Sequence, residues 1–237
     1  MSFRNLIETD TFTLVARCER TGMLGIVVST REIAVTSRCP HVKAKVGAVS
    51  TQARTDPRLG HLAIKLLEMG YSAPRVVEEL KASDPYVEHR QIGVVDKDGN
   101  SAAYTGSNNR DWAGHIAKKN YVAMGNFLIN GEVVRAMAET FEASTEKSLE
   151  ERLMRAIEAA RDAGGQHGGQ HSAGILVYDW EIFPRVDLRV DHHDEPIGEL
   201  RRILEVYKPL IPYYALRPSD PTIGSSDEWL LRQKRST

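Results

Sequence analysis

The chain has 237 residues, 41% of them hydrophobic, with a formal net charge of −1 and a pI near 6.7. This length and hydrophobic content suffice for one sizeable core, so we expect a single domain that includes everything from residue 11 to residue 237. The balanced charge and the lack of a long apolar run or signal-peptide core predict a cytoplasmic protein that binds neither nucleic acid nor a membrane.

The first half of the chain predicts three strands followed by a pair of helices. The strand segments are residues 11–17, 24–30 and 44–51, and the first two are joined by a turn at Gly22. From Pro57 the apolar residues recur at helical spacing as far as Gly70, and a second helix with Ser72 as its cap ends near residue 84. Asp56 is placed to cap the helix that starts at Pro57.

The second half repeats this order of strands and then helices. Strands are expected over residues 90–96, 101–106, 121–124, 172–179 and 185–191. Asn130 is placed to cap one helix, and the capping box from Ser148 to Glu151 begins the next, with Glu151 and Arg155 positioned to pair. A last helix is expected near residues 200–207, and the proline-rich tail from about residue 208 is predicted to be irregular.

Groups of strands that alternate with pairs of helices do not fit a parallel doubly wound sheet. They favour an α+β fold in which two stacked antiparallel sheets are covered by helices on both outer faces. No linker is long enough to mark a second domain, and residues 1–10 are set apart as an N-terminal leader.

Thr11, at the start of the first strand, is the candidate nucleophile. If the chain is cut after Asp10, one residue carries both a hydroxyl and an α-amine with a pKa of about 8 that can serve as its base. β-Branched residues also favour strands for structural reasons alone, so an ordinary strand threonine is the alternative interpretation.

Several segments, taken in order, resemble the DUF1028 family over nearly all of residues 11–207. The segments are TFTLVARCERTGMLGIVVST, VGAVSTQARTDPRLG, RQIGVVDKDGN, the AYTG and WAGH stretch, GGQHGGQHSAGILV and VDLRVDHHDEPIGEL. That family is grouped with the N-terminal-nucleophile (Ntn) hydrolases, so the resemblance implies a four-layer αββα sandwich and hydrolysis of an amide bond. In the family this strand begins almost at the initiator methionine, whereas ten residues precede Thr11 here. The resemblance therefore implies catalysis only if self-cleavage or a protease removes the leader.

Further candidate site residues lie at the ends of two predicted strands. Asn126 can donate to the oxyanion of a tetrahedral intermediate, although turn formation before a helix also explains it. Thr51 and Gln52 end an apolar strand and are candidates for substrate binding. Arg54 follows them and can bind a substrate carboxylate with its planar guanidinium.

Histidine and cysteine side chains supply the remaining candidates. His171 stands where family members tend to carry a residue that cannot titrate, so it is a candidate acid or base near neutral pH. His167, His171 and His193 lack an established metal-ligand spacing, and we predict no metal and no cofactor. Cys18 and Cys39 are expected to be buried free thiols.

These observations predict a hydrolase of a small amide or other C–N bond, linear or cyclic, that acts in catabolism on a small molecule. Thr11 would attack the carbonyl, Asn126 would help to hold the oxyanion, and Arg54 would orient a carboxylate. A noncatalytic protein that binds a small metabolite and keeps its leader is one alternative, and a histidine-based or metal-assisted amidohydrolase is another. Because Ntn-type sandwiches often assemble, the resemblance also implies a homodimer.

Overall fold

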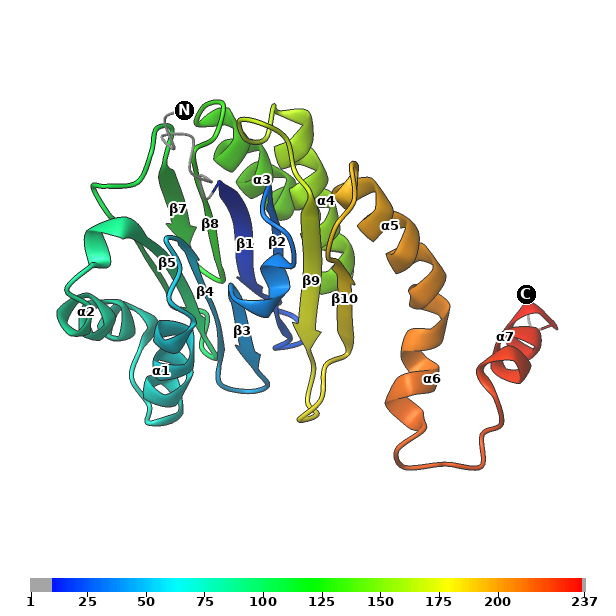
Figure 1. Cartoon of the computed structure of the whole chain (residues 1–237). Helices are drawn as coiled ribbons and strands as arrows, with labels where there is room; N and C mark the ends of the chain where they lie inside the picture. Colours follow the sequence, from blue (N-terminus) through cyan, green and yellow to red (C-terminus); the bar gives the residue numbers. More distant parts are fainter. Residues whose placement is uncertain (1–9, 236–237) are drawn as a thin grey trace.

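In the part of the chain that the structure describes, ten antiparallel strands in two sheets form the centre of the protein (Figure 1). The computed structural model describes residues 10–235, so the predicted leader lies outside the described part except for Asp10. The larger sheet has the strand order β10 (Val186–Val190), β9 (Ser172–Tyr178), β2 (Leu24–Thr30), β1 (Thr11–Arg17), β8 (Tyr121–Asn126) and β7 (Gly114–Lys118). The smaller sheet has the order β3 (Pro40–Lys43), β4 (Gly47–Ala53), β5 (Arg90–Asp96) and β6 (Ser101–Thr105).

Helices cover the outer face of each sheet. The larger sheet packs against α3 (Glu132–Ala143), α4 (Leu149–Asp162) and α5 (Pro196–Tyr207). The smaller sheet packs against α1 (Pro57–Glu68) and α2 (Ala73–Ser83). Figure 1 shows these two groups of helices on opposite sides of the sheets. The predicted α+β fold, with four layers in the order αββα, is confirmed.

Side chains of β1 point alternately to the helix-covered face of the larger sheet and to the layer between the two sheets. Phe12 and Leu14 belong to the core under the helices, whereas Val15 packs between the sheets with Val122 and Met124 of β8. Since successive side chains of a strand point to opposite faces, Thr11 and Thr13 lie on the same side as Val15. The layer between the sheets is therefore apolar around Val15 and polar near Thr11.

Two strands were absent from the sequence prediction, and a third begins later than predicted. β3 and β7 are short edge strands of four and five residues, and their side chains are partly exposed. Such strands lack the apolar alternation that marks a buried strand. β4 begins at Gly47 rather than residue 44 and continues to Ala53, because its partner β5 pairs with it through Arg90.

The helix caps agree with the prediction in part. Asp56 accepts a hydrogen bond from the amide of Arg58 and caps α1 as predicted. Glu151 and Arg155 pair at 2.8 Å, as expected. The predicted capping box of α4 is wrong, since the side chain of Ser148 makes no capping bond. The physical reason is that Glu151 faces Arg201 and Lys208, whose positive charges hold its carboxylate away from the helix start.

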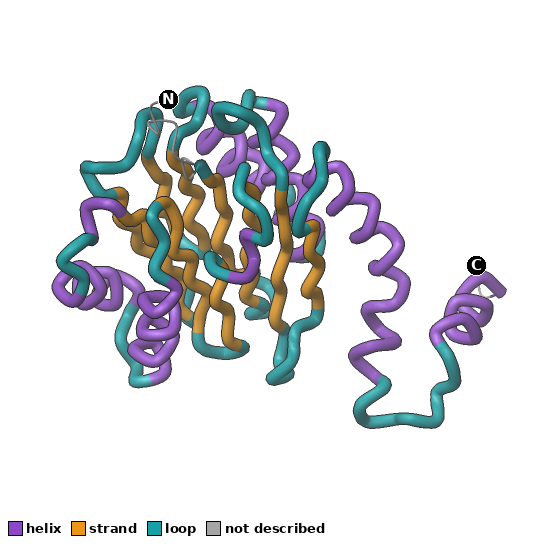
Figure 2. Tube along the Cα trace, viewed as in Figure 1, coloured by secondary structure: helices purple, strands orange, loops and turns teal. Residues whose placement is uncertain are grey.

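The prediction of an irregular tail is also wrong. The chain continues after α5 through a short 3-10 turn (Lys208–Leu210) into α6 (Ile211–Leu216), and α7 (Ser226–Arg235) follows a loop. Proline is tolerated in the first turn of a helix, where Pro212 stands, so prolines did not exclude helices here. Figures 1 and 2 show α6 and α7 projecting beyond the sheets. Within residues 10–235, no helix is both long and apolar enough to cross a membrane.

Candidate active site at the start of the first strand

Thr11 lies at one end of the larger sheet, in a row of polar residues on adjacent strands. It pairs with Thr30 of β2 on one side and with Asn126 of β8 on the other. Thr30 in turn pairs with Ser172 of β9. All four residues are buried, and Thr11 is only 4% exposed. Antiparallel pairing thus brings together residues that lie up to 161 positions apart in the chain.

The hydroxyl of Thr30 connects the candidate nucleophile with the peptide bond that precedes it. Thr11 Oγ1 donates a hydrogen bond to Thr30 Oγ1 at 3.1 Å. Thr30 Oγ1 donates in turn to the carbonyl oxygen of Asp10. A donor on this carbonyl draws electrons away from its carbon, which favours attack by a nearby nucleophile. The arrangement places a polarising donor on the Asp10–Thr11 peptide bond.

Asn126 is directly opposite Thr11, and its amide is held by a neighbouring glutamine. Asn126 Nδ2 donates to Gln91 Oε1 at 3.0 Å. This bond uses one hydrogen of the amide group and leaves the other for a ligand. Asn126 Oδ1 is buried and has no hydrogen-bond partner among the described residues. Asn126, a candidate from the sequence, thus lies opposite Thr11, and its amide retains capacity for a further hydrogen bond.

Two buried glutamines join the sheets behind this row. Gln52 of β4 donates to Gln91 Oε1 at 2.7 Å and to the Thr11 carbonyl oxygen at 3.3 Å. Gln52 Oε1 accepts from the hydroxyl of Thr13 at 2.6 Å. Gln91 of β5 is placed to donate to the carbonyl oxygen of Gly125 at 2.9 Å. The two glutamines thus hold the backbone of β1 at Thr11 and the backbone of β8 at Gly125.

The carboxyl group of Asp10 is buried immediately before Thr11. Neither of its oxygens has a hydrogen-bond partner among the described residues. Burial raises the pKa of Asp10 to about 7, although nearby backbone groups outside hydrogen-bond geometry and the charge of Arg31 act in the opposite direction. A carboxyl group in this condition is more stable in its neutral form. The uncleaved chain therefore carries an ionisable group whose charge destabilises the fold.

This burial predicts a pH-dependent effect of Asp10→Asn in the uncleaved protein. The pKa of Asp10 is higher in the folded than in the unfolded chain, so stability falls as pH rises from about 4 to about 7 and then levels off. The variant removes this loss. Its free energy of unfolding should be on the order of 2–4 kcal/mol higher than that of the native chain at pH 8, and almost equal to it at pH 4. Urea unfolding at both pH values measures it, with the exposed Asp194→Asn as control. Equal differences at pH 4 and pH 8 would contradict a buried, titrating Asp10.

The other candidates from the β4 end lie on different faces. Gln52 points into the layer between the sheets, as its bonds to Thr11 and Thr13 show. Thr51 points to the opposite face, where its hydroxyl lies 3.1 Å from that of Thr55. Arg54 is exposed beyond the end of β4, and its backbone amide donates to His89. The structure brings Gln52 to Thr11 and leaves Thr51 and Arg54 outside the buried row.

The backbone of His171 is hydrogen-bonded to the row that contains Thr11. Its amide donates to the Thr30 carbonyl oxygen at 2.9 Å, and its own carbonyl accepts from His193. Its ring lies 5.7 Å from that of His192, centroid to centroid. In the part of the chain that the structure describes, no three histidine, cysteine or acidic side chains converge as metal ligands would. Cys18 and Cys39 are buried free thiols, as predicted.

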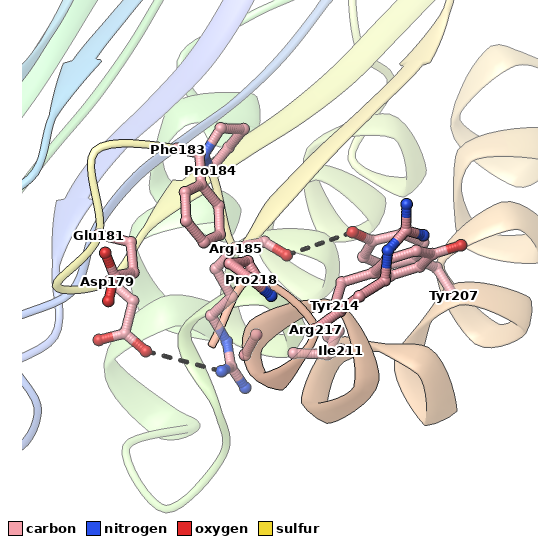
Figure 3. Close-up of a pocket in the computed structure, with 11 residues that line it drawn as sticks. Asp179, Glu181, Phe183, Pro184, Arg185, Tyr207, Ile211, Tyr214, Arg217 and Pro218 are labelled. Atoms are coloured by element: carbon pink, nitrogen blue, oxygen red, sulfur yellow. Dashed lines mark hydrogen bonds and ion pairs between the residues drawn. The ribbon is translucent and has the colours of Figure 1, made fainter. Parts of the chain in front are cut away.

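A cavity of about 440 Å³ lies away from this row, between the β9–β10 connection and the C-terminal helices. Figure 3 shows Phe183 on one wall and Tyr207 and Tyr214 on the other, with Asp179 and Arg185 at one side. The two tyrosine rings are stacked with centroids 5.5 Å apart. None of the residues that line this cavity belongs to the Thr11 row.

Sequence reasoning missed Thr30 and Gln91. Each occurs near the end of an apolar strand, Thr30 in LGIVVST and Gln91 in RQIGVVD. Their positions in the alternation of each strand could have indicated them. A polar side chain that points to the buried face of a strand must find a hydrogen-bond partner there. Identifying that partner requires the pairing of strands, which a single sequence does not give.

The fold and this row define an αββα sandwich protein with a buried hydroxyl-and-amide site at one end of its larger sheet. A family model described as a family of unknown function, DUF1028, matches residues 11–200. The chain belongs to this family. Its last 37 residues, which include most of the C-terminal helical segment, lie beyond the match.

Solved structures agree with this assignment. A crystal structure of a Silicibacter pomeroyi protein assigned to DUF1028 is 31% identical, covers 84% of this chain and 89% of its own, and has a TM-score of 0.78. Anbu, an ancestral β-subunit from Yersinia bercovieri, is 12% identical with a TM-score of 0.38, covering 86% of this chain and 96% of its own. A similarity as low as the second does not assign a function. No curated protein matches the chain.

Proposed function

We propose that the protein is a hydrolase of a small amide or related C–N bond, with Thr11 as its nucleophile after the leader has been removed. The observation that carries the proposal is the pair of hydrogen bonds from Thr11 to Thr30 and from Thr30 to the Asp10 carbonyl. Together they align a hydroxyl, a relay hydroxyl and a polarised carbonyl at one peptide bond. This arrangement favours removal of the leader by the chain itself.

Self-cleavage would proceed by transfer of the acyl group from nitrogen to oxygen. Thr11 Oγ1 attacks the carbonyl carbon of Asp10, the C–N bond breaks, and an ester forms while the nitrogen of Thr11 takes up the proton. Water then hydrolyses the ester, which releases a carboxyl group on Asp10 and restores the hydroxyl of Thr11. The product carries a free α-amine beside that hydroxyl.

The same groups support turnover of a small substrate. Thr11 Oγ1 attacks the substrate carbonyl, its α-amine accepts the proton and delivers it to the leaving nitrogen, and water hydrolyses the resulting ester. Asn126 supports this role because its amide keeps one free hydrogen opposite Thr11. Arg54, exposed beyond β4, is proposed to orient a substrate carboxylate, and Gln52 of β4, whose side chain reaches Thr11, is proposed to contact the substrate. Thr51 faces away from Thr11 and has no part in this proposal. His171 is a candidate acid or base at the edge of this site.

The first experiment is the intact mass of the purified, untagged protein, with N-terminal sequencing of any shortened form. Loss of residues 1–10 from a protein made in a cell-free system without proteases would support self-cleavage and expose Thr11. An uncleaved chain after prolonged incubation would contradict self-cleavage, and a leader that also stays on the protein made in cells would favour the noncatalytic alternative. That alternative is supported by the burial of Asp10 and Thr11 in the uncleaved chain.

The position of Thr30 gives a second prediction. Thr30→Val keeps the shape of the side chain but removes the donor to the Asp10 carbonyl, so leader cleavage should slow by about 100-fold. Thr30→Ser keeps the hydroxyl and should cleave at a rate close to that of the native chain. A time course of intact mass after cell-free synthesis measures both. Cleavage of Thr30→Val at the native rate would show that this hydroxyl has no part in the reaction.

A further inference from the structure

A second cavity, of about 350 Å³, lies at the opposite end of β1 from Thr11. It is formed by the end of β1, the β7–β8 turn, and the adjoining parts of α3 and α4. β1 has seven residues and is therefore about 20 Å long, so this cavity is separate from the Thr11 row. Figure 1 shows the two ends of β1 at opposite ends of the larger sheet.

The side chains around this cavity carry an excess of positive charge. Its lining includes five cationic side chains and two carboxylates: Arg17, Arg20, Lys118, Lys119, Arg152, Glu19 and Glu142. Glu142 is already engaged, since it accepts hydrogen bonds from Lys118 at 2.7 Å and from the hydroxyl of Tyr121 at 2.5 Å. The carboxylates of the cavity wall therefore neutralise only a minority of its cations.

Arg152 is the central observation. It is only 6% exposed, and its guanidinium lies 3.8 Å from the centroid of the Phe141 ring. One nitrogen donates to the Phe141 carbonyl oxygen at 3.0 Å, while Nε has no partner among the described residues. Within that part of the chain, no carboxylate forms an ion pair with it. A buried guanidinium without a counter-ion is costly, and a bound anion would relieve that cost.

Two further arginines at the cavity wall also donate to neutral oxygens rather than to carboxylates. Arg17 donates to the side-chain oxygen of Asn120 at 3.2 Å, and its Nε is buried without a partner in the described chain. Arg20 donates to the carbonyl oxygen of Lys147 at 2.7 Å. Neither forms an ion pair with a carboxylate among residues 10–235. Three arginines thus border one cavity with neutral partners only.

The thiol of Cys18 lies beside Arg152 and could become an anion there. Burial opposes ionisation of its thiol, but hydrogen bonds from Thr21 and the charge of Arg152 outweigh burial and lower the pKa of Cys18. One thiolate would balance only part of the charge of three arginines. The cavity keeps an excess of positive charge in either state of Cys18.

We propose that this cavity binds a small molecule through a phosphate group. A phosphate carries about −1.5 to −2 charges near neutral pH and several strong acceptor oxygens. It can therefore accept hydrogen bonds from three guanidinium groups and balance most of their charge. A carboxylate, with a single charge and two oxygens, would leave most of the arginines without a partner. The inference is independent of the role of Thr11, which lies at the other end of the sheet.

Titration calorimetry with inorganic phosphate tests the site. We expect the native protein to bind phosphate, and the double variant Arg17→Gln/Arg20→Gln to bind it at least about tenfold more weakly, because both changed groups are charged donors at the cavity wall. Both side chains are at least partly exposed, so the double variant should fold. Arg75→Gln, on the exposed side of α2 and paired with Glu79, is the matched control and should bind as the native protein does.

Arg152 and a second anion make the test specific. Arg152→Lys keeps the charge but loses the planar fork, and it should also weaken phosphate binding if it folds, as judged by circular dichroism. Acetate should bind far more weakly than phosphate. Absence of phosphate binding, or equal affinity in the native protein and in Arg17→Gln/Arg20→Gln, would overturn the proposal. Acetate binding as tight as phosphate binding would overturn the assignment to phosphate.

Discussion

Thr11→Ala should abolish both removal of the leader and turnover. The substitution deletes the only hydroxyl that the proposed reactions use as a nucleophile, and removal of a nucleophile from an established hydrolase site costs on the order of 10⁴-fold or more in rate. Intact mass measures the first effect, because the variant should keep residues 1–10 when synthesised without proteases. Hydrolysis of an amide library measures the second.

A reactive probe makes this prediction testable before any substrate is known. A β-lactone that acylates an N-terminal threonine should label the native protein on the peptide that begins at Thr11, and mass spectrometry of the digest would locate the adduct. Thr11→Ala should remain unlabelled, whereas Thr11→Ser, which keeps a hydroxyl, should be both cleaved and labelled. Labelling of Thr11→Ala to the native extent, or turnover by it, would contradict the assignment of the nucleophile.

The same variant separates the two routes by which the leader could be lost. If the chain cleaves itself, Thr11→Ala stays intact even in cells. If a cellular protease trims the leader, the variant loses residues 1–10 in cells and remains inactive. The second result would leave Thr11 as the nucleophile but would remove the proposed role of Thr30 in polarising the Asp10 carbonyl.

The layers of the fold were predictable because they depend on local periodicity. The spacing of apolar residues in residues 57–70 specifies a helix face, and the apolar run from Thr11 to Arg17 specifies a strand. The edge strand Gly114–Lys118 escaped prediction because its exposed side chains do not have to be apolar. The proline-rich tail was misjudged for a different reason. Pro209 and Pro212 stand in helix first turns, where proline is compatible with a helix, and Pro218 and Pro221 lie in the loop before α7.

The site was only partly predictable, because its residues meet through strand pairing. Thr11 and Asn126 could be singled out by their positions at the ends of strands. Gln91 could not, because its importance comes from partners on four other strands, β4, β6, β7 and β8. The resemblance to a family supplied the candidates, and the register of the sheets decided which of them meet.

Gln91 is buried, and its side-chain amide is hydrogen-bonded to several buried partners. Removal of this amide therefore costs stability. Its oxygen accepts from Gln52 at 2.7 Å and from Asn126 at 3.0 Å. Its nitrogen lies 2.9 Å from the Thr105 hydroxyl and within hydrogen-bond distance of two backbone carbonyl oxygens. Loss of one partner from a buried network leaves the others desolvated and unpaired, and each such group costs about 1–3 kcal/mol.

Gln91→Leu should therefore lower the free energy of unfolding by at least about 3 kcal/mol, although the apolar side chain has a similar size. Urea unfolding followed by circular dichroism measures this loss. The exposed Gln233→Leu is the matched control and should change stability by less than about 0.5 kcal/mol. Because Asn126 loses the acceptor that holds its amide opposite Thr11, the variant should also label more slowly with the lactone under conditions where it is folded. A loss below about 1 kcal/mol would mean that water or local rearrangement satisfies the network. Under that outcome, Gln91 would not be what holds Asn126 in place.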